Sequence, residues 1–191
     1  MKNCSFLLLF IILFINCRQK NKQQQLNSQS TDTSNFFPVN DFIISDVKDV
    51  EQTPYYIYKI TVRENNKRDS SSITKEEYNA LANQFLEKNI STTALKPFYK
   101  EATFHDLSTK SFTITYTATD PELYVKDVSI LLDDETNKLK RVFIHCLKDN
   151  GDSTIIEQYS WKAGKSFQIN KSVSRKDGTQ REEQKSVVWH E

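Results

Sequence analysis

Residues 111–119 read SFTITYTAT, and this stretch decides how the second half of the chain folds. Apolar side chains alternate here with hydroxyl side chains: Phe112, Ile114, Tyr116 and Ala118 against Ser111, Thr113, Thr115 and Thr117. A period of two gives a strand one dry face and one wet face. Such strands are typical of antiparallel sheets that rest on a core with one side only.

The rest of the chain repeats this rhythm less cleanly. VSILL, RVFIHCL, TIIEQYSW, SFQINKSV and EEQKSVVW follow in order, separated by DDETNK, DNGD, KAGKS and KDGTQ. The only glycines, Gly151, Gly164 and Gly178, all fall in these junctions. Tight hairpins need positive φ, which glycine adopts without steric cost. The pattern predicts an antiparallel meander from about residue 101 onward.

Helical patterns precede this sheet. In residues 73–89, ITKEEYNALANQFLEKN, Thr74 and Glu77 form a capping box, and an apolar stripe follows at helical spacing: Tyr78, Leu81, Ala82, Phe85 and Leu86. Residues 35–50, NFFPVNDFIISDVKDV, suit a helix with Pro38 in its first turn, although Phe-Ile-Ile could equally be a strand.

Between them, YYIYKITVRE (55–64) reads as a strand whose apolar set is Tyr56, Tyr58, Ile60 and Val62. The predicted fold is therefore α+β, an antiparallel meander with one or two N-terminal helices packed on one face.

The N-terminus carries a targeting pattern. Lys2 precedes ten apolar residues, 6–15, which as a helix would rise about 15 Å, too short to span a bilayer. Cys17 stands where this run turns polar, so the segment resembles a bacterial lipoprotein signal, in which that cysteine is acylated. The alternative is an ordinary signal with an incidental cysteine.

This resemblance and the composition together predict three segments. We expect a signal peptide at 1–16, a lipidated Cys17 that begins a disordered tether over 17–35, and a single domain at 36–191. The segment from Arg18 to Asn35 has Leu26 as its only apolar residue and cannot bury enough surface to order itself.

Net charge and cysteine content limit the partners and the cross-links that we expect. Without residues 1–16, which hold one lysine and no acid, 25 basic residues face 25 acidic ones. A neutral chain has no overall field to attract nucleic acid, so none is expected as a partner. Cys146 is the only cysteine beyond Cys17, so no disulfide can form within the domain.

Few sequence motifs indicate catalysis or the binding of a metal or cofactor. Three scattered glycines cannot form a phosphate-binding loop or a hydrolase nucleophile elbow. His105, His145 and His190 lack metal-ligand spacing, so neither a metal nor another cofactor is predicted. Cys146 shares a strand face with Val142 and Ile144, which indicates an inert core thiol, and His145 falls on the wetter face.

Two acidic clusters invite a calcium site: Asp133, Asp134 and Glu135, and Asp149, Asn150 and Asp152. Neither has the EF-hand spacing. Asp and Asn also suit hairpin turns, where their side chains bond the nearby backbone, and that interpretation is favoured.

Aromatic residues make up 12% of the chain. Trp161 and Trp189, and the group Tyr55, Tyr56 and Tyr58, could belong to the sheet core or line a concave face for a lipid or a protein segment. The core interpretation is favoured.

Several stretches resemble an uncharacterised family of Bacteroidota lipoproteins: NFFPVNDFI, TITYTATDP, KLKRVFI, YSWKAGKSFQI and VVWHE. The likeness covers most of residues 36–191. It implies an envelope location and a single domain, and it carries over no activity and no functional residue.

The sequence thus predicts a lipid-anchored protein of the cell envelope, on the outer membrane and facing the periplasm. We expect a binding module that docks an envelope protein partner through an exposed sheet face or edge. The alternative is a carrier or sensor of an amphiphilic small molecule. An enzyme ranks third, because no nucleophile, base and orienting group can be assembled from the spacing.

Overall fold

The computed structural model describes residues 36–64 and 67–190. The predicted signal peptide (1–16) and tether (17–35), Cys17 included, lie outside these residues. The elements are, in chain order, α1 (Val39–Gln52), β1 (Tyr58–Arg63), β2 (Lys67–Ser72), α2 (Lys75–Leu86), the short 3₁₀ helix η2 (Lys96–Phe98), β3 (Tyr99–Asp106), β4 (Ser111–Ala118), β5 (Val125–Asp133), β6 (Leu139–Asp149), β7 (Ser153–Lys162), β8 (Ser166–Arg175) and β9 (Gln180–Val188).

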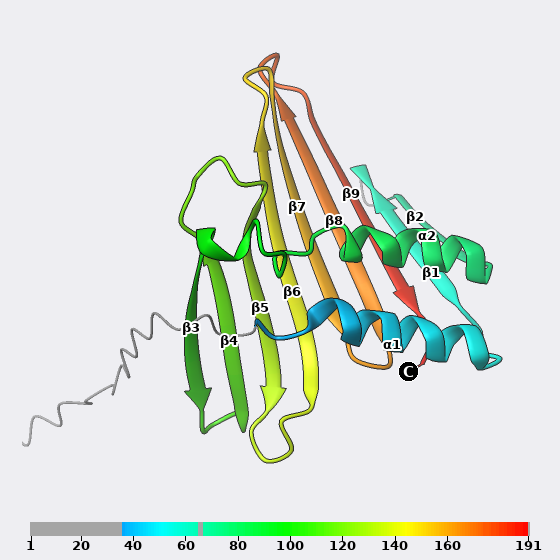
Figure 1. Cartoon of the computed structure of the whole chain (residues 1–191). Coiled ribbons are helices and arrows are strands. Elements are labelled where there is room, and N and C mark those ends of the chain that lie inside the picture. Colours follow the sequence, from blue (N-terminus) through cyan, green and yellow to red (C-terminus); the bar gives the residue numbers. More distant parts are fainter. Residues whose placement is uncertain (1–35, 65–66, 191) are drawn as a thin grey trace, which may run out of the picture. The chain divides into compact units, whose positions relative to one another are not determined.

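One open antiparallel sheet of nine strands dominates the fold, in the order β2-β1-β9-β8-β7-β6-β5-β4-β3 (Figure 1). The predicted antiparallel sheet is confirmed, with β3 to β9 as an uninterrupted meander. Strands form about 50% of the structure and helices about 20%, so the fold is mostly β, more so than the predicted α+β class implies. Part of the excess is β2, KRDSSS, which has no apolar alternation and is a strand because it pairs with β1 from Tyr58↔Ser72 to Arg63↔Lys67.

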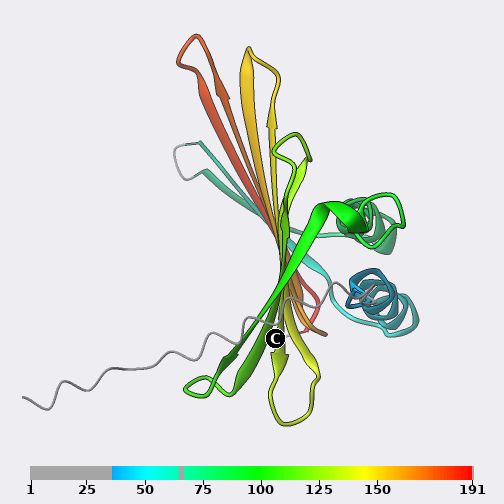
Figure 2. The ribbon, with the colours of Figure 1, turned by 60° about the vertical axis from the view of Figure 1, so that its left-hand side comes forward.

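Both helices lie on one side of the sheet (Figure 2). In α2 the Thr74 hydroxyl accepts a hydrogen bond from the Glu77 amide at 3.3 Å. Four members of the predicted stripe are buried, Tyr78, Leu81, Ala82 and Phe85, and the fifth, Leu86, is partly buried. Residues 39–52 form a helix and not a strand, and this helix buries Ile43 and Val50. Within the described residues, neither helix has the length and apolar character needed to cross a membrane.

An aromatic cluster fills the space between helices and sheet. The Trp161 ring stacks on Phe167 at 5.0 Å, and Phe85 of α2 meets Trp161 edge-on, also at 5.0 Å. Trp161 is fully buried and Trp189 is 4% exposed. The core interpretation of the two tryptophans is therefore confirmed.

The carboxylate of Asp46 ties α1 to the sheet. Its Oδ2 accepts hydrogen bonds from the Trp161 indole N–H and from the Gly164 amide, each at 2.8 Å. Gly164 sits in the β7–β8 turn with φ +63°, and the other two glycines also have positive φ in hairpin turns, as the junction pattern predicted.

Strand β1 turns its apolar set away from the core. Ile57 and Thr61 face the helices and are buried, whereas Tyr58 and, by alternation, Ile60 and Val62 face the opposite side. On the helix side the ammonium of Lys59 pairs with Glu77 of α2. The side chains of Lys59 and Glu77 are 21% and 44% exposed, so this ion pair remains in contact with water.

Candidate functional site: the uncovered sheet face

The side of the sheet opposite the helices (Figure 2) is covered by no helix or strand of residues 36–64 and 67–190, and it is here called the uncovered face. One alternate set of residues from every strand lines it. The strand registers align these residues into rows that run across the sheet. One of them, the central row, consists of Ser70, Ile60, Ser186, Gln168, Ser160, Phe143, Ser129, Thr115 and Ala102, from β2 to β3 in sheet order. No residue of the central row carries a charge.

Hydrogen bonds link amides and hydroxyls along and beside this row. Gln168 donates to Asn170 at 2.9 Å, and the Ser186 hydroxyl donates to Gln168 at 3.5 Å. The hydroxyls of Thr115 and Ser129 lie 3.2 Å apart on the neighbouring strands β4 and β5. With strands spaced about 4.8 Å apart, nine strands give the row a length of roughly 38 Å.

Apolar rings stand among these polar groups. Phe143 is 42% exposed, and the Arg141 guanidinium lies 5.5 Å from the centre of its ring. Tyr56 and Tyr58 stack at 5.9 Å near the start of β1 and are 76% and 48% exposed. The tyrosine group of the sequence is thus divided, since Tyr56 and Tyr58 lie at the surface while Tyr55 packs against the core.

A hollow of about 480 Å³ adjoins the central row over β1, β9, β8 and β7. By strand alternation, most of its lining belongs to the uncovered face: Val62, Glu64, Ile156, Gln158, Asn170, Ser172, Glu182 and Gln184. Arg63, Lys171 and Glu183 complete the lining. This volume suits a small ligand or part of a longer one.

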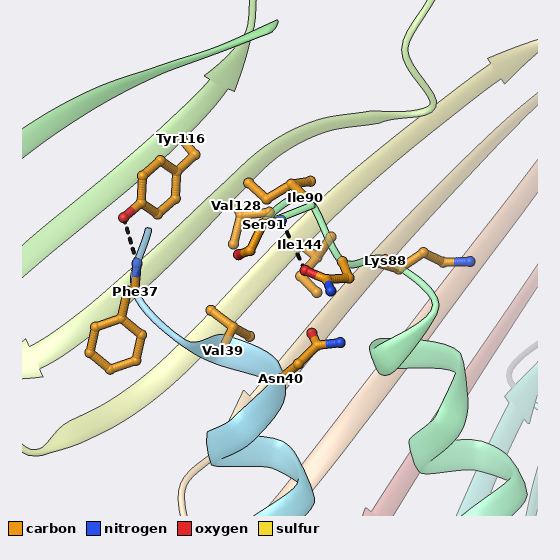
Figure 3. A pocket seen from close by; sticks show the side chains of 10 residues that line it. Phe37, Val39, Asn40, Lys88, Ile90, Ser91, Tyr116, Val128 and Ile144 are labelled. Carbon is orange, nitrogen blue, oxygen red and sulfur yellow. Dashed lines mark hydrogen bonds between the residues drawn. The ribbon is translucent and has the colours of Figure 1, made fainter. Parts of the chain in front are cut away.

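A much smaller hollow lies between the helices and the sheet. Phe37, Asn40 and Lys88 border a hollow of about 10 Å³ there, closed on the sheet side by Tyr116, Val128 and Ile144 (Figure 3). The Phe37 amide donates to the Tyr116 hydroxyl at 2.9 Å across it. Such a volume holds about one water molecule, so an acyl chain does not fit in it.

A buried carboxylate lies on the helix side of β7. Glu157 is 8% exposed and accepts hydrogen bonds from the hydroxyls of Tyr124 and Tyr159, the latter at 2.8 Å, and from the Lys171 ammonium at 2.9 Å. Burial alone would raise the pKa of Glu157, but these three donors hold it at about 2. The cluster is charged and well satisfied, which is typical of a structural network.

Cys146 lies opposite Glu157 on β6 and is fully buried, as its strand face predicted. Burial raises the pKa of its thiol to about 12, so the thiolate that a nucleophile requires is scarce at neutral pH.

The three histidines occupy separate strands or ends of strands. His145 on the uncovered face, as predicted, contacts Asp127 through Nδ1 at 3.1 Å. His105 on β3 contacts Asp134 through Nε2 at 3.1 Å, and the ring of His190 stacks on Tyr55 at 5.9 Å. Within residues 36–64 and 67–190, no group of three His, Cys, Asp or Glu side chains is placed to hold a metal ion.

Side chains of the two acidic clusters accept hydrogen bonds within the hairpin turns. Asp133 accepts from the Thr136 amide at 2.9 Å and from the Lys140 ammonium at 3.0 Å, and these donors with the Thr136 hydroxyl hold its pKa well below the usual range. Asp149 accepts from the Gly151 amide at 2.8 Å. The favoured turn interpretation is confirmed for both carboxylates.

Sequence reasoning missed the central row, because its members come from nine strands and only the registers align them. The one available signal was that serine, threonine and glutamine recur at the polar positions of several strands. Comparisons with protein-family models, with curated proteins and with solved structures found no match.

Proposed function

We propose that the protein is a lipid-anchored binding module of the cell envelope whose uncovered sheet face binds a neutral glycan chain. The observation that carries the proposal is the central row, which crosses all nine strands without a charge. The sequence supports the place of action: Cys17 as the lipidation site, the outer membrane as the anchor and the periplasm as the compartment.

The chemistry of the row matches a polyhydroxylated polymer. Serine and threonine hydroxyls and glutamine amides each donate and accept hydrogen bonds, as sugar hydroxyls do. Phe143 and Ile60 offer apolar surface to the C–H faces of sugar rings, and the adjoining hollow gives room for a branch or a chain end. A row of roughly 38 Å has the extended form that a chain requires.

A protein partner fits this face less well. The cores of protein interfaces are enriched in aromatic residues, methionine and arginine and are depleted in serine. The central row instead holds serine in four strands, at Ser70, Ser186, Ser160 and Ser129. We therefore prefer a glycan to the protein partner that the sequence suggested.

Ser160→Glu tests the binding face. Ser160 lies at the middle of the row between Gln168 and Phe143, and its hydroxyl makes no side-chain hydrogen bond to a described residue. Ser166→Glu is the matched control, because Ser166 lies on the same face one row away and opposite Lys162. Affinity electrophoresis of the full chain in gels that contain neutral glucans, mannans or galactans provides the measurement, with polygalacturonate as an acidic comparison.

We expect at least one neutral polysaccharide to retard the native chain and the Ser166→Glu variant, and to retard Ser160→Glu at least tenfold less. Retardation by none of the neutral polymers, or equal retardation of both variants, overturns the glycan proposal. If the same substitution instead releases a protein cross-linked to this face in envelopes, a protein partner replaces the glycan.

Cys17→Ser tests the anchor separately. Two or more acyl chains hold a protein firmly at a bilayer, whereas the described helices offer no membrane span. We expect the native chain to sediment with membranes and to carry added lipid mass, and the variant to lose both. Unchanged sedimentation without lipid mass contradicts the anchor and leaves the glycan test unaffected.

A further inference from the structure

Strand β3 forms one edge of the sheet and pairs only with β4 among the described strands (Figure 1). Its eight residues, YKEATFHD, leave one row of backbone N–H and C=O groups without a strand partner. Phe104 on this strand is 62% exposed, and Phe98 and Leu107 at its two ends are 43% and 76% exposed. Proteins usually blunt such an edge with a short strand, prolines or lysines, and β3 is neither short nor rich in them.

The opposite edge, β2, differs in these respects. It has six residues, KRDSSS, begins with two cations and carries no apolar side chain. Symmetric pairing of β2 with itself matches its charges poorly. Centring on Asp69 places two aspartates face to face, and centring on Ser70 places charges opposite serines. Centring on Arg68 opposes Lys67 to Asp69 but brings two arginines face to face. The edge suited to pairing is β3.

Two geometric conditions limit how β3 can pair with a second copy of itself. Opposed residues in an antiparallel pair must lie on the same face of the sheet, and a two-fold axis makes every contact reciprocal. Together they allow only registers that are centred on a residue, because a centre between two residues would oppose side chains from different faces.

Among these registers, the one centred on Thr103 matches the charges of the strand. It places Lys100 of each copy opposite Asp106 of the other, and Glu101 opposite His105. Centring on Ala102 instead opposes Lys100 to Phe104, and centring on Phe104 opposes Glu101 to Leu107. Centring on Glu101 brings two glutamates together. Opposite charges stabilise cross-strand pairs and like charges destabilise them.

The side chains are free to make these contacts. Oδ1 of Asp106 accepts from the Ser108 amide and hydroxyl at 2.8 and 2.6 Å, so Oδ2 remains for a lysine of a second copy. On His105, Nε2 contacts Asp134 and Nδ1 remains for Glu101. On the uncovered face, Phe104 lies opposite Ala102 and diagonal to the second Phe104, within reach of an aromatic ring.

We infer that two copies of this chain pair antiparallel through β3, centred on Thr103, and join their sheets into one. The two-fold axis is perpendicular to the sheet, so both uncovered faces point the same way and form one continuous surface. Pairing of this kind does not depend on the ligand of that surface.

Thr103→Cys tests the register. Opposed Cα atoms in an antiparallel pair lie about 4.5 or 5.5 Å apart, and both distances suit a disulfide. Ala102→Cys is the matched control, since its two copies would lie about 8 Å apart, beyond the usual range. Ser71→Cys probes the opposite edge, at β2. The chain without an added cysteine shows how much dimer its own cysteines form. Each full chain is oxidised in membranes and examined on non-reducing gels.

We expect a covalent dimer from Thr103→Cys that reductant removes, with at least fivefold less from Ala102→Cys and Ser71→Cys. Adding Lys100→Glu to Thr103→Cys should lower the yield severalfold, because a glutamate then faces Asp106, whereas adding Lys148→Glu should not change it. Circular dichroism of each variant establishes that it folds. No dimer from folded Thr103→Cys, or equal yields from Ala102→Cys, overturns the inference.

Discussion

Glu157 should make the stability of the fold depend on pH in acid. The residue is 8% exposed. Burial raises the pKa of its carboxyl group, but hydrogen bonds from Tyr124, Lys171 and Tyr159 outweigh that effect and lower the pKa from 4.5 to about 2. A group whose pKa is lower in the folded state stabilises the fold above its unfolded pKa, and this stabilisation disappears as the pH falls toward the folded pKa. At about 1.4 kcal/mol per pKa unit, the ionised form contributes about 3 kcal/mol at pH 7.

Glu157→Gln removes the titration and nearly preserves the shape. Integrating the same two pKa values leaves about 1.4 kcal/mol of this contribution at pH 3. We therefore expect the difference in free energy of unfolding between the native chain and the variant to shrink by about 2 kcal/mol from pH 7 to pH 3. Urea denaturation followed by tryptophan fluorescence measures it, because Trp161 and Trp189 are buried in the folded state.

Glu122→Gln is the control for this experiment. Glu122 is exposed, and its carboxylate makes no hydrogen bond to a described residue. The substitution should change the free energy of unfolding by less than about 0.5 kcal/mol at either pH. A difference for Glu157→Gln that stays constant between pH 7 and pH 3 would refute the assignment of a strongly stabilised carboxylate.

Three further outcomes are expected. Asp46→Ala removes the acceptor for the indole of Trp161 and should lower the free energy of unfolding by about 2–3 kcal/mol in urea denaturation. Asp46→Asn keeps an oxygen and should lower it by about half as much. Equal losses for the two variants would contradict the charge-assisted bonds. Gly164→Ala should lower the free energy of unfolding by about 1–2 kcal/mol in the same assay, because alanine is strained at the φ of +63° that Gly164 adopts. An added Cβ would meet no atom within 4 Å, so the cost comes from the backbone conformation alone. An unchanged stability would show that the turn relaxes. Cys146, whose burial raises the thiol pKa to about 12, should resist maleimide at pH 8 until urea unfolds the chain, as read from the mass of its peptide; labelling of the native state would contradict the packed core.

Local pattern was sufficient for much of the fold. The alternation in residues 111–119 predicted β4, and the capping box at Thr74 with its apolar stripe predicted α2, because each signal acts between near neighbours in sequence. The same reasoning placed Cys146 in the core and His145 on the wet side of β6. Local pattern did not predict strand β2, because KRDSSS becomes a strand only through its pairing with β1.

Pairing over long sequence distances decided the candidate site. Nothing local places β1 beside β9, where Tyr58 pairs with Val188, and that contact helps to turn the apolar set of β1 onto the uncovered face. The bond from Trp161 to Asp46 spans 115 residues and sets α1 on the sheet.

Sequence alone therefore determined most of the strands and which side of most of them is wet, because backbone and side-chain periodicity are local properties. Tertiary structure alone decided that one uncharged residue from each of nine strands aligns into a single row and that β3 lies at an edge of the sheet. Register and strand order arise from hydrogen bonds and packing between residues far apart in the chain, and no local pattern carries that information.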